Sequence, residues 1–228
     1  MIPALIVPYL RPEPIERLLP SIDEPVGRLV VIDNGSGHPR PGAISLPANI
    51  GVAGAWNLGL KVTADAEWWA IVNDDVVFGP GDLVRLAHAM REPDPRIVTL
   101  DGFSAFAMNR AVLDAVGYFD EAFVPAYCED CDYEYRCRRV GIPILALDVG
   151  LQHERSSTIA DPHYREQNAR TYPRNLDYFR AKWGGGPRGN ESYATPFDRG
   201  GSLADWTLDP RRFREQRWTR RDDSVGAG

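Results

Sequence analysis

Apolar and polar residues alternate along the chain between runs of strand length and stretches with helical spacing. The apolar runs of strand length cover residues 4–9, 28–33, 43–47, 67–73 and 142–150. Helical spacing is found in residues 14–22, 54–64, 81–90 and 129–141. Strands separated by helices of this length predict a mostly parallel, Rossmann-like central sheet with helices on both faces. The fold class that we expect is therefore α/β.

The same pattern predicts how the chain is divided. We expect one domain over residues 1–158, made of two halves that meet near residue 100, and a C-terminal extension over residues 159–228 packed on it. A long helical stretch begins after Asp161, with Pro162 in the first turn. We expect Pro173 to kink or split this helix, because proline removes a backbone hydrogen bond. The extension is therefore expected to be helical and irregular.

Composition narrows the class of protein. The 228 residues are 43% hydrophobic and 25% charged, with a net charge of -6, as expected for a soluble globular protein. A non-specific nucleic-acid binder would normally be basic, so nucleic acid is not an expected partner. No apolar run approaches the roughly 20 residues of a membrane helix. The N-terminal apolar stretch is broken by Pro3 and Pro8, so we interpret it as a strand and not a signal peptide.

Three cysteines, at positions 128, 131 and 137, are the only ones in the chain. An odd number in one short segment does not indicate a disulfide framework, so a cytoplasmic location is expected. Cys128, Cys131 and Cys137 with His153 have the residue types of a Cys₃His zinc site, and Cys128-x-x-Cys131 those of a redox dithiol. Buried cysteines that only pack are the simpler interpretation.

The segment Asn73-Asp74-Asp75 interrupts the apolar run of residues 71–79. Adjacent carboxylates repel each other and are costly to desolvate, so they need a compensating partner. A divalent cation such as Mg²⁺ or Mn²⁺ prefers oxygen ligands and could bind Asp75, while Asp74 or Asn73 contacts a ligand sugar or ribose. A junction between a strand and a turn also favours Asn and Asp, and the tripeptide alone does not decide between the two.

Other polar segments follow predicted strands or loops. Asp33 closes the strand of residues 28–33, and Gly51 lies in a loop where glycine permits close backbone approach to a ligand. Because ligands bind beyond the carboxyl ends of parallel strands, Asp33 and the acids at 73–75 are expected at one edge of the sheet. The absence of G-x-G-x-x-G after the first strand argues against a dinucleotide-dependent oxidoreductase.

Taken together, these segments resemble an inverting glycosyltransferase of family 2 with the GT-A fold, similar to bacterial rhamnosyl- and galactosyl-type sugar transferases. The motifs that carry the resemblance are VIDNGS (31–36), NIGVAGAWN (49–57), IVNDDV (71–76), GYFDEAF (117–123), YCEDCDYEYRCRRVG (127–141) and the histidine of LQHERSS (151–157). The metal motif here is Asn-Asp-Asp where that family has Asp-x-Asp, and Asp75 occupies the metal-binding position. The resemblance covers about residues 3–200.

The resemblance implies transfer of a sugar from a nucleotide diphosphate-sugar to a hydroxyl of a glycan, lipid-linked or protein acceptor. It implies that the first half, about 1–100, binds the donor and that the second half, about 101–158, holds the acceptor and the catalytic groups. The metal, Mn²⁺ or Mg²⁺, would be held by Asp75 and His153. The implied donor-binding residues are Pro8, Tyr9, Arg11, Asp33, Asn49, Gly51, Asn57, Asn73 and Asp74. Without a membrane anchor, a membrane acceptor would be reached by peripheral contact.

The acceptor hydroxyl must lose its proton as it attacks, and a carboxylate can act as the general base. We expect Asp130 to be this base, at the start of the predicted helix of residues 129–141, with Glu129 as the alternative. A non-catalytic protein that binds nucleotides or sugars on the same fold is the alternative function, because fold does not fix function.

Overall fold

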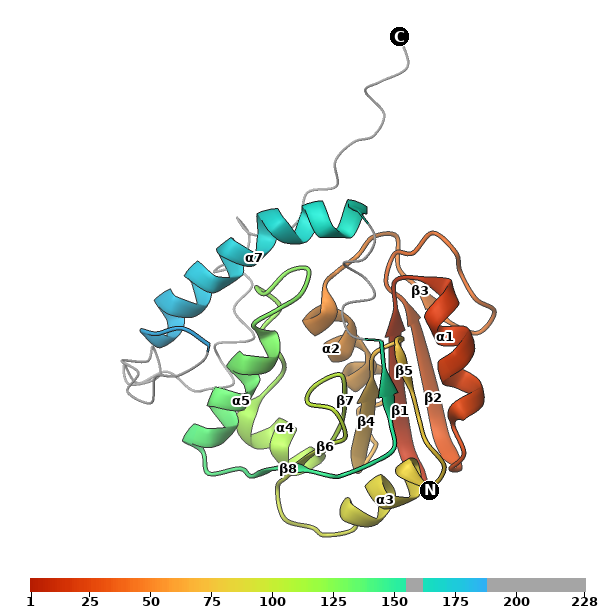
Figure 1. Ribbon diagram of the computed structural model, residues 1–228. Coiled ribbons are helices and arrows are strands. Elements are labelled where there is room, and N and C mark those ends of the chain that lie inside the picture. Colours follow the sequence, from red (N-terminus) through yellow and green to blue (C-terminus); the bar gives the residue numbers. More distant parts are fainter. Residues whose placement is uncertain (155–161, 188–228) are drawn as a thin grey trace.

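The computed structural model describes residues 1–154 and 162–187, which form a layered α/β structure (Figure 1). The strands are β1 (Ile2–Tyr9), β2 (Val26–Asp33), β3 (Ile44–Ser45), β4 (Trp68–Val72), β5 (Val76–Val77), β6 (Ile97–Thr99), β7 (Ala105–Asn109), β8 (Ile144–Ala146) and β9 (Gln152–His153). The helices are α1 (Pro12–Leu18), the 3₁₀ turn η1 (Leu19–Ser21), α2 (Val52–Val62), α3 (Asp82–Ala89), α4 (Arg110–Val116), α5 (Glu129–Arg139) and α7 (Pro162–Trp183).

The expected central sheet is present. Seven strands are arranged in the order β3-β2-β1-β4-β7-β6-β8, and a separate pair is formed by β5 and β9. The pairings β1–β2, β1–β4, β2–β3 and β6–β8 are parallel, whereas β7 is antiparallel to both of its neighbours. The carboxyl ends of β2, β1 and β4 therefore lie side by side at one edge of the sheet.

Helices cover both faces of the sheet, as the pattern predicted. On one face, Ile15 of α1 and Leu86 of α3 pack with every second residue of β1 from Leu5 to Tyr9. On the other face, Trp56 of α2 and Tyr133 of α5 pack with Ala4 and Ile6 of β1. Alternate residues of β1 enter opposite layers because successive side chains of a strand point to opposite faces. The two apolar layers hold the sheet between the helices, and the polar turns lie at the carboxyl ends of its parallel strands.

Two expectations about local structure need correction. The strand expected over residues 67–73 ends at Val72, and Asn73, Asp74 and Asp75 lie in a turn. Val76 and Val77 belong to a different strand, β5, which pairs with β9. Ending β4 before the acids keeps their carboxylates out of the fully buried strand, where desolvation would be costly.

Of the two outcomes expected at Pro173, a kink or a split of the helix, the split is absent. Helix α7 runs from Pro162 to Trp183 without a break, with Pro173 inside it. Packing against α5 explains how the helix continues, because Phe179 and Trp183 of α7 are buried against Tyr135 and Phe123. Tertiary burial outweighs the local cost of the proline. Within the described part of the chain, no helix is long and apolar enough to cross a membrane.

Candidate active site

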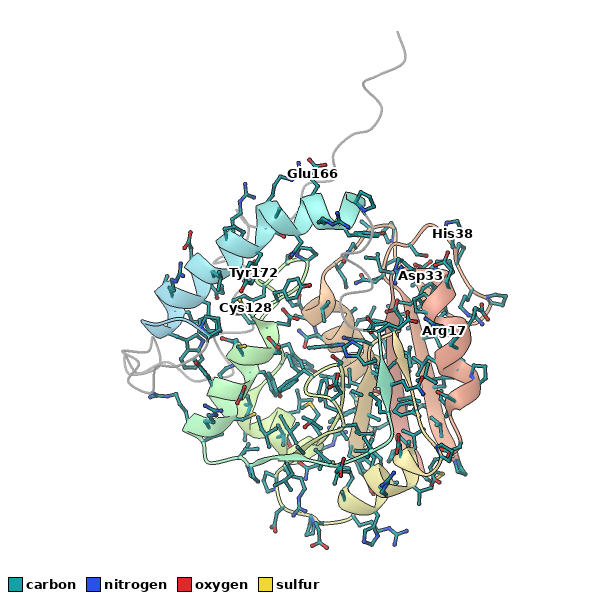
Figure 2. The ribbon with its side chains drawn as sticks, in the orientation of Figure 1. Arg17, Asp33, His38, Cys128, Glu166 and Tyr172 are labelled. Carbon is teal, nitrogen blue, oxygen red and sulfur yellow. The ribbon has the colours of Figure 1, made fainter. Side chains whose placement is uncertain are left out.

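Three strand ends build the donor side of the candidate site. β1 lies between β2 and β4, and Tyr9, its last residue, is in register with Asp33, the last residue of β2. The backbone N–H of Leu10, just beyond β1, donates to Asp74 Oδ2 at 3.1 Å. The Asp33 turn and the Asp74 turn thus flank the end of β1, as the parallel topology predicts. Figure 2 shows Asp33 at this edge.

Asp33 and the loop of residues 49–51 are held together by an asparagine that the sequence analysis did not single out. Asn34 donates to Asn49 Oδ1 and to the Gly51 carbonyl, both at 3.2 Å, and accepts from the Ile50 N–H at 3.0 Å. Asp33 Oδ1 accepts from the Ser36 N–H at 2.7 Å. The position of Asn34 directly after the acid that ends a predicted strand is the feature of the sequence that could have indicated this residue.

Glycine at position 51 is required by the backbone conformation and packing of the fold itself. Its φ is +85°, which disfavours other residues. A Cβ atom there would lie 3.2 Å from the Pro125 carbonyl oxygen. The same carbonyl accepts from the Val52 N–H at 2.8 Å. The close contact is therefore between two backbones, and it joins the start of α2 to the loop that leads into α5.

Two other expected donor-binding residues are engaged within the protein. Tyr9 is buried, and its hydroxyl donates to the His38 carbonyl and accepts from the Arg40 N–H. Asn57 is also buried and bonds to the backbone of Phe119 on both sides of its amide. These contacts hold the loop after β2 and connect α2 to the 117–123 segment. Pro8 is half-buried near the end of β1.

Arg11 follows β1 and Asn73 follows β4, so both lie at the same sheet edge. The Nε of Arg11 is buried and has no hydrogen-bond partner among the described residues. The Asn73 N–H donates to the Ser104 carbonyl at 2.8 Å. This bond joins the acidic turn to the turn between β6 and β7.

Asp75 and His153, which the resemblance implies as metal ligands, lie opposite each other. His153 Nε2 is 3.3 Å from Asp75 Oδ1. The pairing of β5 with β9 causes this, because Val76 is in register with His153. The Glu154 N–H also donates to the Asp75 carbonyl at 3.0 Å, and the Glu154 carboxylate pairs with Arg17 of α1, which is labelled in Figure 2.

A third acid, Asp101, touches the same imidazole from the other side. Asp101 Oδ2 is 2.6 Å from His153 Nδ1. The sequence did not indicate Asp101, because nothing in the segment LDGFS of residues 100–104 resembles a metal motif. It lies in a turn before β7, and only the tertiary fold brings it to residue 153.

The carboxyl of Asp74 differs from that of Asp75 in its surroundings. Burial raises the pKa of Asp74 to about 6, and the negative charge of Asp75 adds to this rise. The backbone N–H groups of Leu10 and Arg11 act in the opposite direction, since they stabilise the ionised carboxylate. A cation beside these residues would offset the repulsion between the two acids.

Helix α5 begins at the candidate base. Glu129 is 6% exposed, and its Oε2 has no hydrogen-bond partner within the described residues. Burial, with the neighbouring charge of Asp130, raises the pKa of Glu129 well above its usual range. Asp130 is half-buried, and its Oδ1 accepts from the Cys131 N–H at 2.7 Å. Asp132, two positions further, is fully buried in an ion pair with Arg136.

Helix α5 is near the Asp75 side of the site. The pKa of Tyr127, two residues before the helix, is raised by burial first and then by the charges of Glu129 and Asp75. Tyr127 has a φ of +77°, which is uncommon for a residue other than glycine. Its ring meets that of Tyr172 on α7 edge to face, with 5.6 Å between centroids. Figure 2 shows Tyr172 beside the start of α5.

The cysteines do not form the Cys₃His site considered as an alternative. Within residues 1–154 and 162–187, no group of three or more His, Cys, Asp or Glu side chains is arranged to hold a metal ion. Cys128 and Cys137 pack in different apolar clusters, and His153 faces Asp75. Burial raises the pKa of Cys128 to about 12, so its thiol is not reactive near neutral pH.

Comparisons with known proteins agree with this architecture. No family model and no curated protein matches the chain. The mannosyltransferase PcManGT from Pyrobaculum calidifontis, solved with GDP-Man and Mn²⁺, is 17% identical with a TM-score of 0.55. TarS 1-349 from S. aureus is 19% identical with a TM-score of 0.52. Glucosyl-3-phosphoglycerate synthase from Mycobacterium tuberculosis, solved with Mg²⁺ and UDP, is 16% identical with a TM-score of 0.50.

These similarities establish the fold. They cover 77%, 65% and 70% of this chain, and 63%, 58% and 73% of the respective structures. This chain therefore spans only about three fifths of the mannosyltransferase and TarS chains. The protein has the GT-A fold of these glycosyltransferases, as the sequence resemblance implied.

Proposed function

We propose that the protein is a metal-dependent glycosyltransferase that moves a sugar from a nucleotide diphosphate-sugar to an acceptor hydroxyl with inversion. The observation that carries the proposal is the pair Asp75 and His153, with Oδ1 and Nε2 3.3 Å apart at the sheet edge that also bears Asp33. An acid and an imidazole at this separation can coordinate one cation together. The fold supports the proposal, since the three similar structures are glycosyltransferases.

The donor set suits a hard divalent cation. Mg²⁺ and Mn²⁺ sites on phosphate substrates use one or two protein ligands, with water and phosphate oxygens at the other positions. Asp75 and His153 supply two such ligands. When bound, Mn²⁺ or Mg²⁺ would supply positive charge against the diphosphate as it leaves the sugar.

The other residues of the site would bind and orient the donor. Asp33, the last residue of β2, would accept a hydrogen bond from the base of the nucleotide, and Asn34 donates to Asn49 at 3.2 Å. Asp74 is fixed by the Leu10 N–H, so the turn that carries Asp75 has little freedom to move. Rigid turns of this kind lower the entropy lost when the donor binds.

Asp130 would act as the general base. The oxygen of the acceptor hydroxyl forms a bond to the anomeric carbon, the bond from that carbon to the diphosphate breaks on the opposite face, and the hydroxyl proton passes to the Asp130 carboxylate. Asp130 is half-buried, whereas Glu129 is buried and Asp132 is bound in an ion pair. Glu129 remains the alternative base because it is the neighbouring carboxylate in the first turn of α5.

A thermal-shift experiment tests the proposal. We expect one of UDP, GDP or TDP, added with Mn²⁺, to raise the Tm of the protein, because a ligand that binds only the folded state stabilises it. The shift is expected to be lost without Mn²⁺ and in Asp75→Ala. Asp114→Ala, an exposed acid on α4, is the matched control and should keep the full shift.

Two results would contradict the proposal. One is the absence of any shift with all three nucleotides and Mn²⁺. The other is a shift of equal size in Asp75→Ala. A donor that binds but is never hydrolysed or transferred to any hydroxyl would favour a non-catalytic binding protein on the same fold.

A further inference from the structure

The imidazole of His153 is held between two carboxylates that contact different ring nitrogens. Nε2 lies 3.3 Å from Asp75 Oδ1, and Nδ1 lies 2.6 Å from Asp101 Oδ2. The His153 side chain is 14% exposed, and those of Asp75 and Asp101 are 10% and 26% exposed. The shorter contact has the length of a strong, charge-assisted hydrogen bond. The two acids therefore contact different ring nitrogens, and the contact of Asp101 is the shorter one.

Asp101 is held in a tight turn. The Ser104 N–H donates to the Asp101 carbonyl at 3.1 Å, and Asp101 forms an isolated bridge with Phe103. The Ser104 carbonyl in turn accepts from the Asn73 N–H at 2.8 Å. The turn that carries Asp101 and the turn that carries Asp75 are thus bonded through their backbones. Neither carboxylate can move far relative to His153 without breaking this link.

We propose that Asp101 is a positioning residue that selects the proton-bearing nitrogen of His153 and so prepares the ring to bind a cation; this inference rests on the proposed function. A neutral imidazole carries one N–H, and the hydrogen bond made by one nitrogen decides which form is present. The Asp101 carboxylate accepts a hydrogen bond from Nδ1–H of His153. The lone pair of Nε2 is then directed toward Asp75. In the other form, Nε2–H would donate to Asp75 and occupy the cation position.

Asp101 cannot itself share that cation with Asp75. Its carboxylate lies on Nδ1, at the opposite side of the ring from Nε2. A carboxylate in this outer position fixes the orientation of a metal-binding histidine and increases its basicity. Asp101 therefore acts on the cation site through His153.

Manganese binding tests the inference without an activity assay. Mn²⁺ is titrated into the wild-type protein and the variants in the presence of UDP, GDP or TDP, and free Mn²⁺ is measured by electron paramagnetic resonance. Removal of an outer-shell partner typically weakens metal binding about 10- to 100-fold, and we expect this loss for Asp101→Ala. Asp101→Asn, which keeps the shape and loses the charge, should lie between Asp101→Ala and wild type. Asp114→Asn is the surface control and should not differ from wild type.

NMR spectra of the metal-free protein identify the ring nitrogen of His153 that carries the proton. Long-range ¹H–¹⁵N spectra at pH 8 distinguish the two neutral imidazole forms, and His153→Gln identifies the signal among the four histidines. We expect the Nδ1–H form in wild type and a shift toward the Nε2–H form in Asp101→Ala. Circular dichroism checks that each variant is folded. If Asp101→Ala does not fold, the same measurements are made on Asp101→Asn.

Several results would overturn the inference. They are an Nε2–H form or a doubly protonated ring in the wild type at pH 8, an unchanged form in Asp101→Ala, or wild-type Mn²⁺ affinity in both Asp101 variants. Failure of the proposed function has a different signature. In that case no nucleotide supports Mn²⁺ binding by the wild type, while the spectra of the metal-free protein still report whether Asp101 controls His153.

Discussion

Three acidic residues that look alike in the segment EDCD of residues 129–132 have three different environments. Glu129 is buried without a partner for Oε2 among the described residues, Asp130 is half-buried, and Asp132 is fully buried in ion pairs. Their positions on the first turn of α5 cause the difference, because successive helix residues point about 100° apart. Of these three acids, only Asp130 is partly exposed, and it lies outside the buried ion pairs that hold Asp132.

Replacing Asp130 tests this assignment. We expect Asp130→Asn to lower kcat for transfer by a factor of about 10² to 10⁴, the usual contribution of a general base. The affinity for the donor should change little, since the donor side is built from other strands. Steady-state kinetics and calorimetric donor titrations measure the two effects. Glu134→Gln, on the surface of the same helix, is the control.

An Asp130→Asn variant with near-normal kcat would show that the base is another residue. If Glu129→Gln then caused the large loss, the base would be Glu129. The two substitutions therefore separate neighbouring carboxylates that the sequence alone left as alternatives.

At the scale of elements, α7 is attached to α5 through buried charges. Lys182 of α7 lies 2.6 Å from Asp120 and 2.5 Å from Asp132, and all three side chains are fully buried. Trp183 Nε1 also donates to Asp132 at 2.8 Å. These groups surround the first turn of α5, so the C-terminal helix supports the residues that precede and follow Asp130. Figure 1 shows α7 passing along the end of α5.

Removal of the buried cation should be strongly destabilising. We expect Lys182→Met to lower the free energy of unfolding by about 3 to 5 kcal/mol. The buried carboxylate of Asp120 loses the cation that faces it, and that of Asp132 loses one of two, since it still faces Arg136. Urea unfolding measures the change. Lys61→Met is the matched control: Lys61 is half exposed and 3.5 Å from Glu121, and exposed pairs contribute about 0 to 1 kcal/mol. Equal effects of the two substitutions would show that burial of Lys182 does not matter.

At the scale of the whole molecule, Glu129 connects the candidate site to global stability. Its pKa is raised in the folded protein, mainly by burial. A carboxyl with a raised pKa favours folding most at pH values below its unfolded pKa, about 4.3. That contribution is lost as the pH rises toward the folded pKa, because ionisation then favours the unfolded chain.

The substitution Glu129→Gln removes this ionisation. We expect its free energy of unfolding, relative to wild type, to increase as the pH rises from about 4.3 through the folded pKa of Glu129, and then to level off. Urea unfolding between pH 4 and pH 8 gives the difference at each pH. A difference that stays constant over this range would show that Glu129 titrates normally in the folded protein. Site residues kept at a cost in stability are common in enzymes.

The sequence by itself determined the layers of the molecule and much of the candidate site. Periodicity of apolar residues is a local property, so it predicted the alternation of strands and helices and hence the parallel sheet. Given that sheet, the order of the motifs placed Asp33 and the 73–75 turn at one edge. Asp75 and His153 were paired by resemblance to a family, and the structure places them opposite each other.

Only the tertiary structure decided the contacts between distant segments. Asp101 meets His153 because β5 pairs with β9, and neither two-residue strand has a pattern that the sequence reveals. The end of β4 before Asn73 and the unbroken helix through Pro173 also depend on burial, which local propensity does not contain. The physical reason is the same in each case. The free energies of desolvation and of hydrogen bonds between residues far apart in the chain are larger than those of local conformational preferences.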